Sequence, residues 1–162
     1  MVDVTEISAI VAAIGVLIGV ALAVLELRDL VKTRKTDVVM RLHSEFTKKE
    51  MVEASVKFLG LQFKDYDDFQ RKYGSILSGS QEVIVTMMNG MFFEGIGVLV
   101  HRGLVDIDLV RDLFSITLPW EKIKPIAEGL RSQFGEREIF EWYEYLYNEV
   151  KKREQRLKRE GA

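Results

Sequence analysis

Cysteine is missing from the 162 residues of the sequence, which excludes disulfide bonds and metal sites built on cysteine. Histidine is scarce as well: His43 and His101 are too few for a common zinc site unless carboxylates or a second chain contribute. None of the 23 Lys and Arg residues precedes Arg28, and within residues 1–25 only Asp3 and Glu6 carry negative charge. The other 23 acidic residues balance the 23 basic ones, which argues against nucleic acid as the main partner.

The start of the chain contains a long uncharged apolar run, "ISAIVAAIGVLIGVALAVL", from Ile7 to Leu25. As a helix its 19 residues would be about 28 Å long, close to the ~30 Å hydrocarbon core of a bilayer. A cleaved signal peptide would have basic residues before such a run and a small-residue cleavage site after it. Here acidic residues precede the run and "ELRD" follows it. We therefore expect a retained transmembrane helix rather than a signal peptide or a buried soluble helix.

Four basic residues follow the run closely: Arg28, Lys32, Arg34 and Lys35. By the positive-inside rule they predict a single span with the N-terminus outside and the C-terminal part in the cytoplasm of the cell. They are also expected at the membrane surface, facing anionic lipid headgroups. The predicted organisation is a transmembrane anchor with a basic juxtamembrane helix over 1–35, followed by a cytoplasmic helical domain over 36–162.

Small residues form a stripe within the run, with Gly15, Gly19 and Ala23 each four residues apart. Such a stripe lets two helix backbones approach closely in lipid, so it predicts self-association into a homo-oligomer; a chance occurrence of common small residues is the alternative. A pore formed by several copies needs polar lining. Within the run only Ser8 is polar, and the span ends add Thr5, Glu6 and Glu26.

Neither proline nor glycine occurs between Val20 and Leu59, so the first helix is expected to continue beyond the membrane. "TKKE" at 47–50 has the pattern of a capping box and predicts a new helix that ends near Gly60. Three carboxylates at 65–68 are interpreted as the start of a helix, because the glycine and glutamate of a calcium-binding EF-hand loop are missing.

Residues 81–102 are the most apolar part of the body, and Glu94 is the only charge between Val83 and Val100. A glutamate at the centre of a span is costly, so we predict the central helix of a soluble bundle rather than a second span. Three glycines within it would permit close helix contacts: Gly90, Gly95 and Gly97. The three methionines at 87, 88 and 91 are interpreted as core packing rather than soft-metal ligands.

Glu94 lies among apolar residues and is expected to be partly buried, which requires a polar partner. We expect a buried polar cluster in which Glu94 pairs with Arg131 or accepts from the indole N–H of Trp120. A structural carboxylate is favoured over a catalytic or ion-binding one. An enzyme would need Glu94, Arg131 and His101 to converge in a cleft.

Further along, Gly103 is predicted to stop the helix and Asp106 to cap the next one. Pro119 fits the first turn of a helix, within which Pro125 marks a kink or the true start. The apolar spacing from Ile139 to Val150 predicts an amphipathic helix with a basic end, which is either solvated or touches lipid phosphates. Strand alternation, phosphate loops and nucleophile elbows are not found. The fold prediction is all-α, with one transmembrane helix continuing into a bundle of five to six helices.

The block "FFEGIGVLVHRGLVDIDLVRDLF", followed by "PWEKIKPIAEGLR" and "IFEWYEYL", resembles a family of small prokaryotic membrane-anchored proteins of unknown function. The recurring parts are Phe93-Glu94, Gly97, Arg102-Gly103, Asp106, Trp120, Pro125 and Arg131. The resemblance implies that 83–100 belongs to the soluble body, and it implies no activity or cofactor. We therefore expect a non-enzymatic, self-associating interaction or scaffold protein that binds the bilayer and no nucleic acid, cofactor or metal. A homo-oligomeric channel or transporter is the alternative.

Overall fold

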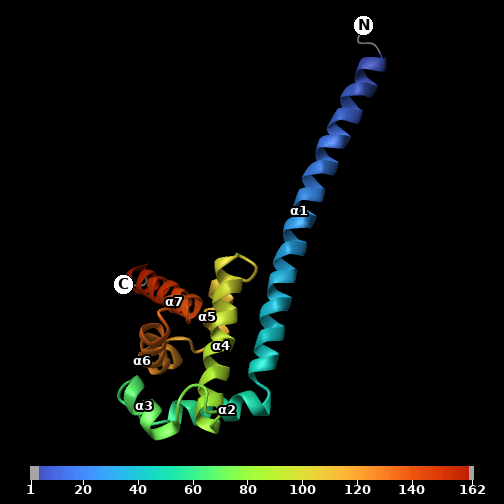
Figure 1. Cartoon of the computed structure of the whole chain (residues 1–162). Coiled ribbons are helices and arrows are strands. Elements are labelled where there is room, and N and C mark those ends of the chain that lie inside the picture. The colour runs from blue at the N-terminus through green and yellow to red at the C-terminus, as the bar shows by residue number, and fades with distance from the viewer. Residues whose placement is uncertain (1–3, 161–162) are drawn as a thin grey trace. The chain divides into compact units, whose positions relative to one another are not determined.

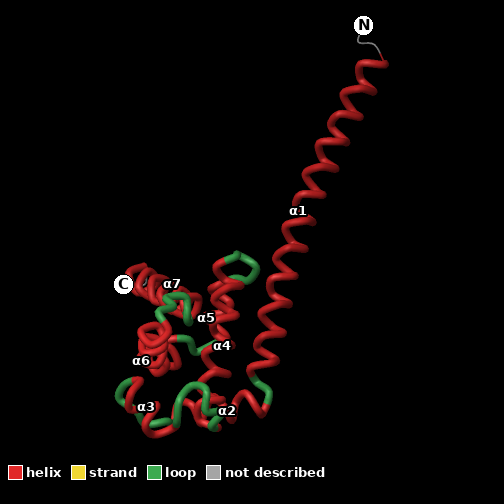
Figure 2. The backbone as a smooth tube through the Cα atoms, viewed as in Figure 1, coloured by secondary structure: helices red, strands yellow, loops and turns green. Residues whose placement is uncertain are grey.

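The structure, a computed structural model, describes residues 4–160, and these form seven α-helices without a β-strand (Figures 1 and 2). The prediction of an all-α fold is confirmed. The helices are α1 (Val4–Phe46), α2 (Lys49–Gly60), α3 (Tyr66–Tyr73), α4 (Gln81–His101), α5 (Ile107–Leu113), α6 (Thr117–Phe134) and α7 (Glu141–Glu160).

The chain divides into two compact units, residues 1–37 and residues 38–162. The second unit, called the body below, contains α2 to α7 and the last turns of α1. The predicted count of five to six bundle helices is therefore slightly off. The physical reason is that the end of α1 also packs into the body, where Val39 is fully buried.

The first unit is a single helical segment, and α1 as a whole has 43 residues, which correspond to about 65 Å. This length follows from the lack of proline and glycine after Val20. From Val11 to Val38 its apolar side chains are exposed, and by length and composition the helix can cross a membrane.

The other described helix that is long and apolar enough to span a membrane is α4. In contrast to the span region of α1, it packs against α7 and α2 and contributes eight buried residues to the body (Figure 1). Phe93 and Ile96 are fully buried. This burial agrees with the prediction of a bundle helix. The core helix of a folded body can have the same apolar composition as a membrane span, so composition alone does not distinguish the two.

Aromatic side chains form much of the core of the body. Phe93 stacks on Tyr143 with ring centroids 4.9 Å apart, and Trp120 meets Tyr143 edge to face at 4.9 Å. The last turn of α1 joins this core through Phe46, whose ring lies 5.7 Å from Phe93 and 5.6 Å from Phe114. α1, α4, α5, α6 and α7 thus share one hydrophobic core.

The helix boundaries confirm some of the expected signals and correct others. Gly103 adopts a left-handed conformation after α4, and Asp106 accepts hydrogen bonds from two backbone N–H groups at the start of α5. The capping box at 47–50 is wrong: the Thr47 hydroxyl donates to carbonyls of α1, and the residue before α2 is Lys48, without a side-chain cap. α6 begins at Thr117, so Pro125 lies inside the helix and does not mark its start.

Candidate functional site

The small-residue stripe of α1 lies on an uncovered helix surface. Gly15, Gly19 and Ala23 are exposed, and a Cβ atom built on either glycine would meet no other atom within 4 Å. The larger apolar side chains around them are exposed too, among them Leu17 and Leu22. The single chain therefore leaves this face open. Of the polar groups at the N-terminal end of the apolar run, Asp3 lies outside the described residues, as do the side chains of Thr5 and Glu6.

Directly after the apolar run, Arg28, Lys32, Arg34 and Lys35 form what we call the basic collar. All of its side chains are exposed except that of Lys35, which is partly buried. Among the described residues, none of the four has a carboxylate within 4.0 Å. Arg28, Lys32 and Lys35 share one side of the helix by their spacing of four and three residues. Their charge is therefore available to anions.

In the body, the partner of Glu94 differs from the prediction. Its carboxylate accepts hydrogen bonds from the backbone N–H groups of Trp142 at 3.3 Å and Tyr143 at 2.7 Å. These are first-turn residues of α7, where N–H groups have no partner within the helix. Glu94 thus caps α7 from another helix. The physical reason for the error is that backbone donors, which every sequence has, replace the side-chain donors that we expected.

The local backbone explains why α7 needs this remote cap. Phe140 precedes the helix with a φ of 58°, and its side chain has no oxygen that could accept from the helix start. The Phe140 ring instead packs against α4 at Gly90, where a Cβ would lie 2.6 Å from it. At Gly97 a Cβ would lie 2.0 Å from the Trp142 carbonyl oxygen. Gly90, Glu94 and Gly97 lie on one face of α4 and together seat the start of α7.

Burial is the largest influence on the Glu94 carboxyl group and raises its pKa; the bonds from Tyr143 and Trp142 act against this shift. Glu141 raises the pKa further and Arg131 lowers it through longer-range charge. A raised carboxyl pKa is typical of some catalytic acids. Here, however, both carboxylate oxygens accept hydrogen bonds from backbone N–H groups, so Glu94 acts as a structural helix cap.

The other two members of the expected polar cluster have their own partners among the described residues. Arg131 donates through Nε to the Ile139 carbonyl oxygen at 2.8 Å and through Nη1 to Glu144 at 2.7 Å. It therefore fastens the loop before α7 rather than pairing directly with Glu94. Trp120 is buried among aromatic rings.

His101, the third member of the hypothetical catalytic group, is exposed at the end of α4. Its ring lies 4.3 Å from Trp142 and 5.2 Å from Tyr145. None of the hydrogen bonds of Glu94 or Arg131 reaches it. Within residues 4–160 no group of three or more His, Asp or Glu side chains is arranged to hold a metal ion.

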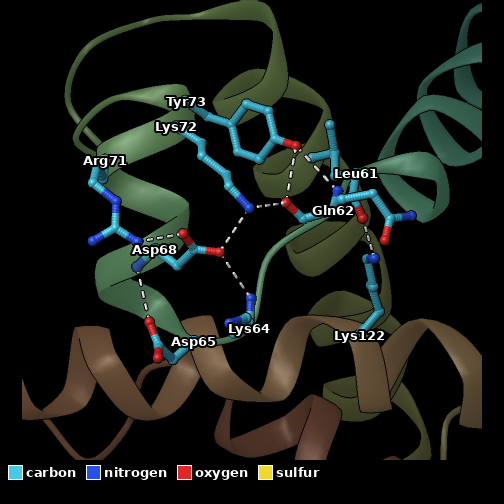
Figure 3. Close-up of polar contacts among 9 residues, drawn as sticks. All are labelled: Leu61, Gln62, Lys64, Asp65, Asp68, Arg71, Lys72, Tyr73 and Lys122. Carbon is cyan, nitrogen blue, oxygen red and sulfur yellow. Dashed lines mark hydrogen bonds and ion pairs between the residues drawn. The ribbon is translucent and has the colours of Figure 1, made fainter.

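A second polar cluster, which was not predicted from the sequence, surrounds Asp68 on α3 (Figure 3). The buried Asp68 carboxylate accepts from Arg71 at 2.5 Å, from Lys72 at 2.9 Å and from the Lys64 backbone N–H at 3.1 Å. The hydrogen bonds from Lys72 and then Arg71 lower its pKa to about 2. Asp65 caps the same helix by accepting from the Asp68 N–H at 2.8 Å, at the helix start that the carboxylates at 65–68 predicted.

The Asp68 cluster also ties the loop before α3 to its neighbours. Lys72 donates to the Gln62 carbonyl at 3.1 Å, and the Tyr73 hydroxyl accepts from the Gln62 N–H at 3.0 Å. Lys122 of α6 reaches the Leu61 carbonyl from the other side (Figure 3). Every group here bonds to the protein itself, so the cluster orders the connection between α2 and α3. The sequence signal for it was the spacing of Asp68 to Arg71 and Lys72, at i+3 and i+4.

Between α3 and α6 the surface is hollowed by about 450 Å³. Tyr66 and Gln133 meet at this hollow with a hydrogen bond of 2.7 Å, and Gly129 lies directly under the Tyr66 ring. Its acidic lining comes from Asp65, Asp67 and Glu128. These carboxylates are exposed, so the arrangement is a polar surface depression rather than a built ligand site.

A family model described as a domain of unknown function, DUF4760, matches residues 12–150. The chain therefore belongs to this family, which agrees with the expected membership of an uncharacterised family. No curated protein and no solved structure matches the chain.

Proposed function

We propose that this member of the DUF4760 family is a single-pass membrane protein that self-associates through α1 and presents its body in the cytoplasm as an interaction or scaffold module. The observation that carries the proposal is the span region of α1, whose apolar side chains and small-residue stripe are exposed. Exposing about twenty apolar residues to water would be strongly unfavourable, and a bilayer removes that cost.

Self-association is the second part of the proposal. In lipid, helices associate by close packing, and the stripe at Gly15, Gly19 and Ala23 offers a surface without protruding side chains. The basic collar supports the orientation with the body inside the cell, since positive flanks stay on the cytoplasmic side.

The body fits an interaction role better than a catalytic one. Its most unusual carboxylate, Glu94, serves as a helix cap, and the Asp68 cluster is satisfied by the chain's own groups. α2 and α4 meanwhile expose apolar side chains such as Val56 and Met91, which are 68% and 65% exposed. Exposed apolar groups are a common feature of surfaces that contact other proteins.

The experiment is a mass determination of the full chain in detergent micelles by light scattering. We expect an oligomer for the natural chain and a shift to monomer for Gly15→Leu combined with Gly19→Leu, because leucine side chains would hold the backbones apart. Ala21→Leu also adds apolar volume, but two residues from Gly19 and on the opposite side of the helix, and it should leave the mass unchanged.

A natural chain that is monomeric in micelles would contradict self-association. Conductance of the purified oligomer in a planar bilayer would instead favour a channel, in which the spans surround an opening.

A further inference from the structure

The surface between α5 and α7 contains a hollow of about 330 Å³ that is rich in arginine. Its lining residues are Asp108, Arg111, Arg153, Arg156 and Leu157. α5 contributes the first two and the basic end of α7 contributes the others. Three arginines line this one hollow, and guanidinium groups are suited to bind an anion.

Two of these arginines are held in place by carboxylates. Asp108 accepts from Nη1 of Arg153 at 2.6 Å and lies 3.4 Å from Nη1 of Arg111. Arg111 is fixed further by Asp112, at 2.8 Å. Since Arg111 is only 22% exposed and Arg153 38%, both guanidinium groups are partly ordered before any ligand arrives. Nε and Nη2 of Arg153 remain as donors, because its bond to Asp108 uses Nη1 alone.

The lining of the hollow carries net positive charge, because it contains three arginines and one carboxylate. Arg156 makes no ion pair with any described carboxylate, and its side chain is exposed. Residues 151–159 hold six basic side chains and one acidic one, Glu154, which lies 3.7 Å from Lys151. The end of α7 therefore carries excess positive charge beside the hollow, and an anion would reduce the repulsion.

We propose that this hollow binds the phosphate of an anionic phospholipid headgroup. Guanidinium groups bind phosphate oxygens through paired hydrogen bonds, which favours a phosphate over a chloride-like ion. Leu157 lines the same hollow and is 51% exposed. An apolar side chain among cations matches the boundary between headgroups and acyl chains, whereas a free phosphate compound gives it no partner. The inference rests on the proposed membrane anchoring, which keeps the body near a bilayer.

The test uses the full chain with the four collar residues changed to glutamine, so that the collar cannot bind the lipid. Native mass spectrometry in an uncharged detergent measures lipid bound at rising concentrations of phosphatidylglycerol or phosphatidylcholine. We expect tighter binding of phosphatidylglycerol. Arg156→Gln should weaken it about fivefold, the effect of one cation near an anionic lipid. Because no described carboxylate pairs with Arg156, this variant keeps the contacts of the body that the structure describes.

Lys152→Gln is the matched control, since it removes one positive charge from the same helix but lies outside the hollow, where Lys152 pairs with Glu149. An equal loss in both variants would overturn the proposal in favour of diffuse surface charge. Equal binding of the two lipids would overturn it as well. Displacement of the lipid by an equal concentration of inorganic phosphate would show that the lipid is not the ligand. None of these outcomes depends on the oligomeric state, so the proposed self-association can fail independently.

Discussion

At the scale of single residues, the start of α7 depends on a carboxylate that lies 48 residues earlier in the chain. Glu94 supplies the acceptor that Phe140, the residue before the helix, does not have. Side-chain caps at helix starts typically contribute about 1 kcal/mol, and losing one leaves N–H groups without a partner.

We predict that Glu94→Ala lowers the free energy of unfolding of the body by about 1–2 kcal/mol. Urea unfolding in micelles, followed by tryptophan fluorescence, measures this directly, because Trp120 and Trp142 both lie in the body. Glu136→Ala, at an exposed loop position, should change the free energy little. Equal effects of the two substitutions would count against the capping role.

Asp68 gives the body a defined response to acid. The hydrogen bonds from Lys72 and Arg71 lower its pKa from an ordinary 3.8 to about 2. Because the pKa is lower in the folded state, Asp68 stabilises the fold above about pH 4, and this contribution is lost as the pH falls towards about 2. We expect Asp68→Asn to remove this part of the acid sensitivity. Unfolding midpoints at decreasing pH measure it, and an unchanged pH profile in the variant would refute the assignment.

At the scale of elements, one face of α4 packs closely against the start of α7, and another face of α4 is not covered by other atoms. Gly97 lies against the Trp142 carbonyl, whereas a Cβ at Gly95 would meet nothing within 4 Å. The two glycines are two residues apart in one helix and therefore form a matched pair.

We predict opposite effects of alanine at these two positions. Gly97→Ala should destabilise the body by about 1–3 kcal/mol, because the methyl group would press against backbone that cannot move away alone. Gly95→Ala should stabilise it by up to about 1 kcal/mol, through the better helix propensity of alanine. Thermal unfolding of both variants decides this. Destabilisation by Gly95→Ala of the same size would mean that α4 is packed differently.

The helices themselves could be predicted because their signals are local. Apolar spacing, the long stretch without proline or glycine, the acidic helix start at 65–68 and the cap at Asp106 all act within a few residues. The partner of Glu94 could not be predicted, because nearly every residue has a backbone N–H and the sequence does not indicate which of them donates. Thr47 shows the same limit: its pattern fits a capping box, but its hydroxyl donates to the His43 and Ser44 carbonyls instead.

At the scale of the whole molecule, the protein consists of an exposed apolar helix and a body with its own hydrophobic core. We propose that the first unit lies in the bilayer and the body on one side of it. This proposal also requires that α4, which could span a membrane by composition, stays in the body. The location of the body and the placement of α4 within it can both be tested by finding on which side of the membrane the segments before and after α4 lie.

The most direct measurement is thiol labelling in intact cells, made simple because the chain has no cysteine of its own. One thiol is introduced before α4 by Leu77→Cys, at a position where the natural leucine is 83% exposed. The other is introduced after α4 by Ser132→Cys, where the natural serine is also exposed. With a membrane-impermeant reagent, we predict that neither thiol is labelled until the cells are permeabilised, and that both are labelled then. Labelling of both in intact cells would contradict the cytoplasmic body, and labelling of only one would show that α4 crosses the membrane.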